Sequence, residues 1–345
     1  MWSIIGHAAP LAALERAIES GAPAHAWLFA GPEGLGKRTA AIEFAAALNC
    51  LSPDNKPCGQ CRPCLDTLAS RHTDVELVAP GGMCDEPDHR DHADSRGLRI
   101  CQVRRLERVL STTAYSGGRR VAVVDAADTL QAEAANAFLK TLEEPPAGSV
   151  IILLVERPER LPETVMSRCQ RLDFRPIDRD TLHEALTARG ADASTAEAIT
   201  SAAAGRIGWA LRALEDPSML DERSRMLDDA VRLAHAGRVA RFAWARDAQG
   251  RGSDDARERY LRELSIWETW WRDVLLYSAG GSDGALNRDR AAVLSQEGNM
   301  YRPTEIVAFL QSLINTREMM QANVDPQLAL ENLTMDLPRV VTSNK

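Results

Sequence analysis

Four cysteines close together in the chain have the spacing of metal ligands. They follow a C-x7-C-x2-C-x2-C pattern and are Cys50, Cys58, Cys61 and Cys64. The segment between them is rich in turn-forming residues, so four thiolates can surround one Zn²⁺ without straining the chain. Four protein ligands leave no open position on the metal, which favours a structural zinc module over a catalytic one. An iron–sulfur cluster is the alternative that also uses four thiolates.

A second group of residues that could bind a ligand forms a glycine-rich loop between a predicted strand and a predicted helix. The pattern G-x-x-x-x-G-K extends from Gly31 to Lys37. In such a loop, backbone N–H groups, the helix N-terminus and the lysine all attract phosphate oxygens. The candidate nucleotide-binding residues are Gly31, Gly34, Gly36, Lys37 and Thr39.

Two residues that a working ATPase needs are missing. A Ser or Thr normally follows the lysine and binds Mg²⁺, but here Arg38 follows it and Thr39 comes one place late. A buried strand ends at Asp125, where the second nucleotide motif belongs, and the next residue is Ala126. A glutamate there commonly polarises the attacking water, whereas a methyl group cannot accept a proton. The loop is therefore a degenerate nucleotide site, and its residues leave open whether it binds ATP or ADP.

The elements that must position these residues alternate between strands and helices up to residue 176. Apolar runs predict strands at residues 26–30, 74–79, 121–125 and 150–155, with one more before residue 175. Helical spacing predicts helices at residues 10–20, 37–49 and 100–110. Asp128 with Gln131 predicts a capping box that begins another helix. This alternation predicts a parallel, doubly wound α/β sheet with the loop at the carboxyl ends of its strands.

The elements predicted after residue 176 are all helical. Residues 178–214 have the pattern of three short helices broken at Gly190 and Gly205. Further helices are predicted at residues 223–236, 239–249, 256–278, 284–297, 303–322 and from 325 onward. Trp267, Trp270 and Trp271 recur at helical spacing and predict a packing face, against this domain's own core or a neighbouring subunit.

Residues 80–97 interrupt this pattern with an acidic, histidine-containing insertion. Its Cys84, His89 and His92 offer the alternative of a second metal site. The high content of Pro, Gly and Asp favours a solvated loop instead. The sequence does not indicate what the insertion does.

Composition limits the possible classes of protein. The 345 residues include 41 basic and 49 acidic ones, for a net charge of −8 at pH 7, which argues against coating nucleic acid by bulk electrostatics. No apolar run approaches the roughly 20 residues of a membrane span. The N-terminus lacks the basic region and long apolar core of a signal peptide. We therefore expect a cytoplasmic globular protein with no membrane partner, whose cysteines do not form disulfides.

Taken together, the motifs resemble those of the AAA+ clamp-loader subunits of bacterial DNA polymerase III. The resemblance rests on the loop at residues 31–37, the four-cysteine module after its helix, the sequence ANAFLKTLEEPP at residues 135–146, and Ser167-Arg168-Cys169. It covers nearly the whole chain and implies three domains. These are a RecA-like AAA+ P-loop domain with the zinc module over residues 1–176, a small helical lid over residues 177–214, and an all-α collar for oligomerisation over residues 215–345.

Within that family some subunits hydrolyse ATP and others have lost the activity. Besides Arg38 and Ala126, Gly208 stands where the lid arginine of relatives lies, and residues 155–156 replace their γ-phosphate sensor. Each such loss typically costs about 10²–10⁴-fold in rate. The resemblance therefore implies a non-hydrolysing stator within the DNA-directed DNA polymerase holoenzyme. Its Ser-Arg-Cys motif implies that Arg168 is an arginine finger in the ATP site of a neighbouring subunit.

The resemblance also implies partners. These are the delta and gamma/tau subunits of a hetero-pentamer, the beta sliding clamp that the complex loads during replication, and primer-template DNA reached through the complex. One alternative is an active gamma/tau-type ATPase, which needs a rescued magnesium site and base. The other is a zinc-dependent DNA-binding scaffold, which a net charge of −8 does not favour.

Overall fold

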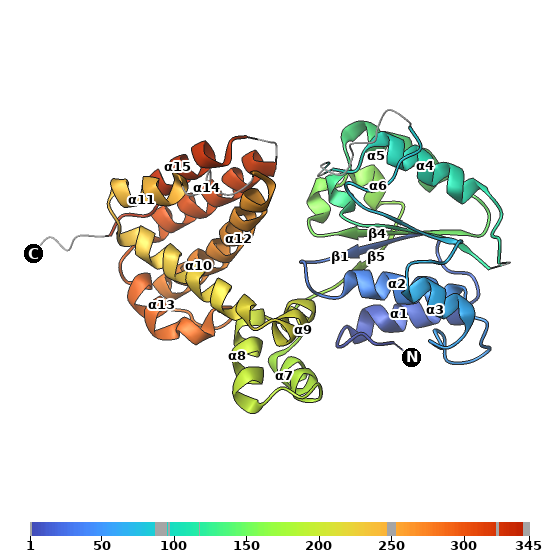
Figure 1. The fold of residues 1–345 in the computed structure, drawn as a ribbon, viewed down its shortest axis with the longest axis horizontal. Coiled ribbons are helices and arrows are strands. Elements are labelled where there is room, and N and C mark those ends of the chain that lie inside the picture. The colour runs from blue at the N-terminus through green and yellow to red at the C-terminus, as the bar shows by residue number, and fades with distance from the viewer. Residues whose placement is uncertain are drawn as a thin grey trace, which may run out of the picture. The chain divides into compact units, whose positions relative to one another are not determined.

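The structure is a computed structural model that describes residues 2–86, 95, 97–116, 118–246, 253–321 and 324–340 (Figure 1). The chain divides into two compact units, one from Met1–Ala185 with Gly205–Trp209 and the other from Leu186–Ala204 with Ala210–Lys345. His89 and His92 of the acidic insertion lie outside the described residues. None of the described helices combines the length and the apolar character that crossing a bilayer requires.

A parallel sheet forms the centre of the first unit, as predicted. Among the described residues it has five strands in the order β2-β3-β4-β1-β5. Their bounds are β1 Ala26–Ala30, β2 Val75–Val78, β3 Arg120–Val124, β4 Ser149–Val155 and β5 Gln170–Asp173. Strands β1 and β4 are buried along their whole length. Continuous apolar runs are typical of parallel strands whose two faces are both covered.

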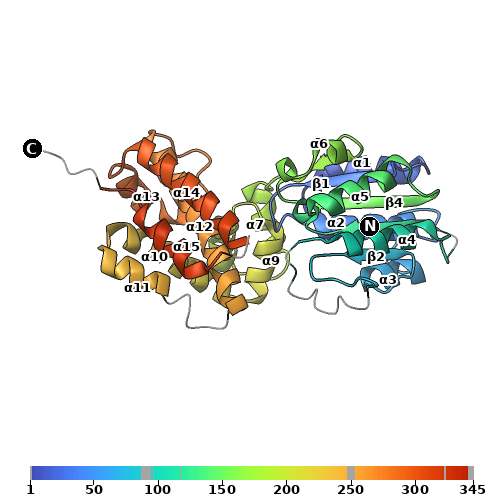
Figure 2. The same cartoon turned by 90° about the horizontal axis from the view of Figure 1, so that it is seen from above.

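Helices cover both faces of this sheet (Figure 1), and the view from above shows α4 and α5 lying over it (Figure 2). Leu28 of β1 packs in the core on the side of α4, α5 and α6, whereas Trp27 and Phe29 pack in the core on the side of α1 and α2. Successive side chains of a strand point to opposite faces, so each core receives alternate residues. The helices of this unit's sheet layers are α1 Ala8–Glu19, α2 Lys37–Leu48, α3 Arg62–Leu68, α4 Ile100–Ser111, α5 Ala132–Glu143 and α6 Glu163–Met166.

The strand order brings three chain segments to one edge of the sheet. Strands β3, β4 and β1 are neighbours, and Ala30 pairs with Val155 at the ends of β1 and β4. The glycine-rich loop follows β1, Asp125 follows β3 and Glu156 follows β4. All three segments therefore meet at the carboxyl edge, where open α/β sheets place their ligand sites.

The three short helices predicted between residues 178 and 214 are present. They are α7 Arg179–Thr187, α8 Ala193–Ala203 and α9 Ile207–Glu215. The chain turns between them at Gly190 and Gly205, which have φ values of 92° and 78°. The boundary between the two compact units passes through this region, and the division into three domains stays a prediction.

The second unit is helical in its described residues, and tryptophans form the centre of its core. Trp267, Trp270 and Trp271 are at most 1% exposed, and Trp244 stacks on Trp267 with ring centroids 4.9 Å apart. The predicted tryptophan face therefore packs within the chain's own core. The helices are α10 Ser218–His235, α11 Arg238–Arg246, α12 Ser253–Ser278, α13 Ala291–Gly298, α14 Pro303–Gln321 and α15 Pro326–Met335.

The helix predicted at residues 284–297 is shorter than expected. A 3-10 turn at Arg288–Arg290 precedes α13, which begins only at Ala291. The fully buried Asp273 accepts hydrogen bonds from the backbone N–H groups of Leu286 and Asn287 at 2.9 and 2.7 Å. This carboxylate holds the segment as a loop, and a sequence pattern cannot reveal a partner so far along the chain.

Candidate functional site: a four-cysteine cluster and an altered phosphate-binding loop

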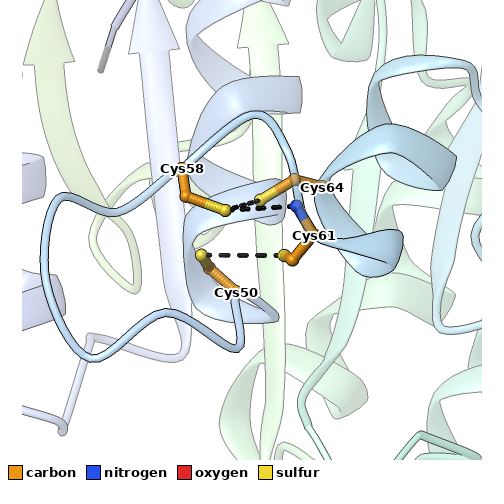
Figure 3. Close-up of side chains that lie close together, drawn as sticks. All are labelled: Cys50, Cys58, Cys61 and Cys64. Carbon is orange, nitrogen blue, oxygen red and sulfur yellow. Dashed lines mark hydrogen bonds between the residues drawn. The ribbon is translucent and has the colours of Figure 1, made fainter.

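The four cysteines predicted as metal ligands come together. Cys50 follows α2, Cys58 lies in the connecting loop, Cys61 caps α3 and Cys64 lies within α3. Their sulfur atoms all lie within 4.8 Å of one another and point toward one centre (Figure 3). The Sγ atoms of Cys58 and Cys64 are 3.9 Å apart, as are those of Cys50 and Cys61.

These distances fit a tetrahedral metal ion. Ligands at the Zn–S distance of about 2.3 Å lie about 3.8 Å apart in a tetrahedron. Backbone N–H groups of Gln60 and Cys61 lower the pKa of the Cys58 thiol to about 6, which favours its thiolate, whereas burial raises the pKa of Cys64 to about 12. A dication nearby stabilises all four thiolates, since metal binding and thiol deprotonation are coupled. The cluster can therefore hold a metal ion such as zinc.

The cluster has little apolar core around it. The small core at this point consists of Ala46 and the cysteines themselves. Cys64 Sγ lies 3.7 Å from the Ala46 carbonyl oxygen, which ties α3 to α2. A module with so few apolar contacts would gain stability from a bound metal ion, as the modules around structural zinc sites do.

The glycine-rich loop wraps tightly over the end of the sheet. The Gly31 N–H donates to the Val155 carbonyl at 3.1 Å and extends the pairing of β1 with β4. Gly31 has a φ of 147°, and a Cβ at this position would lie 2.2 Å from the Phe174 carbonyl oxygen, so no other residue fits. Gly36, with a φ of 88°, is the N-cap of α2. The backbone thus has the course of a phosphate-binding loop, with its helix N-terminus at the sheet edge.

The loop lysine is engaged with the loop itself. Lys37 is 8% exposed, and its ammonium donates to the carbonyl oxygens of Gly31 and Pro32 at 2.5 and 2.7 Å. Burial lowers the pKa of Lys37, and nearby carboxylates of Glu156 and Asp125 oppose this effect, with smaller contributions from Asp128 and Glu33. The positive charge that would meet a phosphate is therefore already surrounded by the protein's own oxygens.

Arg38 lies against the carboxylate at the end of β3. Its Nη1 is 3.6 Å from Asp125 Oδ2, with the two side chains 55% and 31% exposed. In a P-loop NTPase this carboxylate helps to hold Mg²⁺ together with the hydroxyl that Arg38 replaces. Thr39 is exposed one residue further along α2. Ala126 has a φ of 50° directly after Asp125 and offers no proton acceptor on its side chain.

Asp128 binds the backbone that follows β4, and the prediction that it caps a helix is wrong. Asp128 was expected to cap a helix, but α5 begins at Ala132 with no side-chain cap at Gln131. Asp128 instead lies in a 3-10 turn at Ala127–Thr129, and its carboxylate accepts the N–H groups of Glu156 and Arg157 at 3.5 and 3.3 Å. Burial raises the pKa of Glu156, and the charge of Glu33 adds to this rise.

Residues 205–209 lie directly on the loop. The Gly208 N–H donates to the Gly34 carbonyl at 2.7 Å, and a Cβ at Gly208 would lie 3.0 Å from the same oxygen. No side chain at residue 208 can therefore reach between this segment and the loop without displacing one of them. The guanidinium of Arg206 lies 5.8 Å above the ring of Trp209.

The predicted arginine finger, Arg168, precedes β5 and so lies near the start of β1, whereas the glycine-rich loop follows the end of β1. Arg168 follows α6, and its guanidinium donates to Glu143 Oε1 at 2.5 Å and to the Thr164 carbonyl at 2.7 Å. Its side chain is 33% exposed and that of Glu143 is 52% exposed. The ion pair joins two of the motifs that the sequence singled out, because Glu143 belongs to the ANAFLKTLEEPP stretch and is the last residue of α5.

One residue that contacts the glycine-rich loop could not be predicted from the sequence. His7 lies at the start of α1, and its Nε2 is 2.8 Å from the Leu35 carbonyl oxygen. Its ring packs on Phe174 with centroids 4.9 Å apart, and burial lowers the pKa of His7. A single histidine before a predicted helix has no spacing that would reveal this contact.

Comparison with known proteins relates this chain to one family. The family model described as DNA polymerase III, delta subunit, matches residues 6–178, half of the chain. A Bacillus subtilis (strain 168) protein named DNA polymerase III subunit delta' is 24% identical over 326 residues, covering 94% of each chain. The Pseudomonas aeruginosa protein of the same name is 38% identical over 147 residues, 42% of each chain.

Among solved structures, this chain is similar to a DNA polymerase III gamma subunit-related protein from Thermotoga maritima, with 19% identity and a TM-score of 0.41 over 93% of this chain and 97% of that one.

The family-model match over residues 6–178 contains the glycine-rich loop, the four-cysteine cluster and Arg168. This chain belongs to the DNA polymerase III delta subunit family.

Proposed function

We propose that this chain is a delta-prime-type subunit of a bacterial clamp loader that does not hydrolyse ATP itself. The observation on which the proposal rests is the ion pair between Arg38 and Asp125. Arg38 replaces the hydroxyl that would bind the metal, and its guanidinium forms an ion pair with Asp125, the carboxylate that would also bind it. Because Mg²⁺ neutralises the charge that develops during phosphoryl transfer, a loop arranged in this way lacks the main electrostatic element of the reaction.

Three further features support the same proposal. Ala126 leaves the position of the general base empty, which typically costs about 10²–10⁴-fold in rate. The ammonium of Lys37 is bound to two loop carbonyls. The contact between Gly208 and Gly34 leaves no room for an arginine that would reach a γ-phosphate from the lid.

Arg168 has the accessibility that a role in a neighbouring subunit requires. An exposed ion pair such as that of Arg168 with Glu143 contributes about 0–1 kcal/mol, so the guanidinium can exchange partners at small cost. In the proposed assembly it leaves Glu143 and approaches the γ-phosphate of ATP bound to the adjacent subunit. A guanidinium in that position offsets charge on the transferring phosphoryl group.

The rest of the chain serves assembly in this proposal. The four-cysteine cluster binds a structural zinc ion, and the helical second unit forms the collar that joins delta and gamma/tau subunits in a hetero-pentamer. That complex acts in the cytoplasm, opens the beta sliding clamp and places it on primed DNA. The chain contacts DNA only as part of the complex, consistent with its net charge of −8.

ATP turnover by the purified chain tests the central part of this proposal. We expect no hydrolysis above that of a preparation lacking the protein, with or without Mg²⁺. The variant Arg38→Thr restores a metal-binding hydroxyl and should remain inactive, because Ala126 still supplies no base. Turnover by the native chain at the rate of an active clamp-loader subunit would identify it as a gamma/tau-type ATPase. Salt-sensitive binding to duplex DNA without clamp-loader partners would favour the DNA-binding scaffold.

A further inference from the structure

The second unit contains a cavity of about 270 Å³ between α11 and α15, two helices that lie side by side (Figure 1). Three arginines and a set of uncharged residues line it. We call it the arginine cavity, and its lining residues are Arg238, Arg241, Phe242, Thr334, Met335, Leu337 and Arg339. No acidic residue is among them, so three guanidinium groups surround one small space without a lining carboxylate.

The innermost arginine is fixed in place by backbone groups. Arg241 donates to the carbonyl oxygens of Leu233, Ala234 and Thr334 at 2.9, 2.9 and 3.1 Å. These carbonyls lie at the C-terminal ends of α10 and α15. Burial lowers the pKa of Arg241, as expected for a cation drawn partly out of water.

The positive charge of the cavity exceeds what its surroundings compensate. Two helix C-termini together supply about one negative charge, roughly −0.5 each, which offsets Arg241. Arg238 and Arg339 add two more positive charges, and no ion pair joins either of them to an acidic residue within the described part of the chain. The nearest acidic residue in sequence, Asp336, accepts a hydrogen bond from Ser312. A guanidinium has five N–H donors, so Arg241 retains two after its three backbone bonds.

The walls of the cavity distinguish between anionic ligands. Phe242 and Met335 give it an apolar side, where Met335 is 53% exposed, and Leu337 behind them is 2% exposed. A nucleic-acid backbone needs a row of cations along its successive phosphates, and three arginines around one small cavity do not form such a row. A peptide carboxylate beside an apolar side chain satisfies both halves of the cavity, because guanidinium groups bind carboxylates through paired hydrogen bonds.

We propose that the arginine cavity binds an acidic peptide segment, with a carboxylate held by Arg238, Arg241 and Arg339 and an adjacent apolar side chain against Phe242 and Met335. The occupant belongs to a partner protein that docks on the helical second unit. This site is separate from the phosphate-binding loop, the cysteine cluster and Arg168, and it does not depend on the function proposed for them.

The test uses the full-length chain and a fluorescein-labelled peptide of sequence Asp-Asp-Asp-Asp-Phe, followed by fluorescence anisotropy. We expect saturable binding with a Kd below about 1 mM. The double variant Arg238→Ala/Arg339→Ala should weaken it about tenfold, since each exposed charge pair contributes a few-fold. Arg241 is left intact because its bonds connect two helix ends. Arg246→Ala, which removes an exposed arginine of the same helix outside the cavity, is the matched control and should bind as the native chain does.

Two further probes separate the alternatives. Replacing the peptide's phenylalanine by serine should weaken binding several-fold, and an unchanged Kd would refute the apolar half of the site. Labelled oligothymidylate should bind weakly and with equal affinity to the native chain and the double variant. Stronger binding of this DNA, lost in the double variant, would assign the cavity to nucleic acid instead. Absence of peptide binding, or equal binding by the double variant, would overturn the proposal.

Discussion

A buried carboxylate in the second unit should make its stability depend on pH. Glu263 on α12 is 1% exposed, and its Oε1 has no hydrogen-bond partner within the described residues. Burial raises the pKa of Glu263 to about 7, and the charge of Asp229 contributes to the rise. In the unfolded chain the same carboxyl titrates at about 4.5. Between these two values the folded protein retains a proton that the unfolded chain has lost, so this group's stabilising contribution falls as the pH rises.

The size of the effect follows from the two pKa values. One pKa unit corresponds to 1.36 kcal/mol, so a folded pKa of about 7 and an unfolded one of about 4.5 give about 3 kcal/mol. The variant Glu263→Gln cannot titrate. Relative to the native chain, its free energy of unfolding should therefore increase by about 3 kcal/mol between pH values below 4.5 and values above 7.

Urea unfolding across this pH range, followed by tryptophan fluorescence, measures the difference. Four tryptophans, at positions 244, 267, 270 and 271, lie in the core that contains this part of α12, so their emission reports its unfolding. Glu258→Gln on the same helix is the matched control, because the Glu258 side chain is 71% exposed. Its stability should follow that of the native chain at every pH. A constant difference between Glu263→Gln and the native chain across the range would refute a buried carboxyl of raised pKa.

The cysteine cluster and the loop give further predictions. The native chain should contain one zinc ion per molecule, as measured by elemental analysis. Cys61→Ser should lose most of this zinc and unfold at a lower temperature, whereas Cys84→Ser should retain it. Finding iron, or no metal, in the native chain would refute the zinc assignment. A strong chelator should lower the unfolding temperature of the native chain and leave that of Cys61→Ser nearly unchanged. Gly208→Ala should destabilise the first unit by about 1–3 kcal/mol through the close approach of its Cβ to the Gly34 carbonyl, as measured by urea unfolding. Gly237→Ala, where a Cβ meets nothing within 4 Å, should cost little, and equal losses in both variants would contradict the tight contact.

Features encoded by neighbouring residues could be predicted from the sequence. The two-residue spacing of Cys58, Cys61 and Cys64 indicated a shared ligand geometry, and their sulfur atoms do converge with that of Cys50. Apolar runs gave the strands of the parallel sheet because a strand buried on both faces has no polar positions. The spacing of three and four residues between tryptophans around Trp267 predicted the core face of α12, because apolar residues at this spacing lie on one side of a helix.

Features that depend on residues far apart in the chain could not be predicted. The contact of Gly208 with Gly34 joins residues that no local pattern relates, and the hydrogen bond of His7 to Leu35 is of the same kind. Asp128 had a plausible local partner in Gln131, but tertiary hydrogen bonds to the end of β4 prevailed.

Arg38 and the arginine cavity differ in how far they could be predicted from the sequence. The departure at Arg38 was visible in the sequence, and only the structure gives it Asp125 as a partner. The arginine cavity had no signal at all. Arg238 and Arg339 stand at distant points of the sequence, and each by itself is an ordinary surface charge.

The most direct test of the account measures ATP turnover at the one site that Arg168 is proposed to serve. The clamp loader is reconstituted with only the adjacent subunit able to hydrolyse ATP, and assembly is verified by size-exclusion chromatography. Arg168→Ala should lower turnover by about 10³-fold or more. Arg171→Ala, which removes an exposed arginine paired with Asp173, and Glu143→Gln, which only frees Arg168, should leave it within a few-fold of native. Unchanged turnover in an intact Arg168→Ala complex would contradict the account.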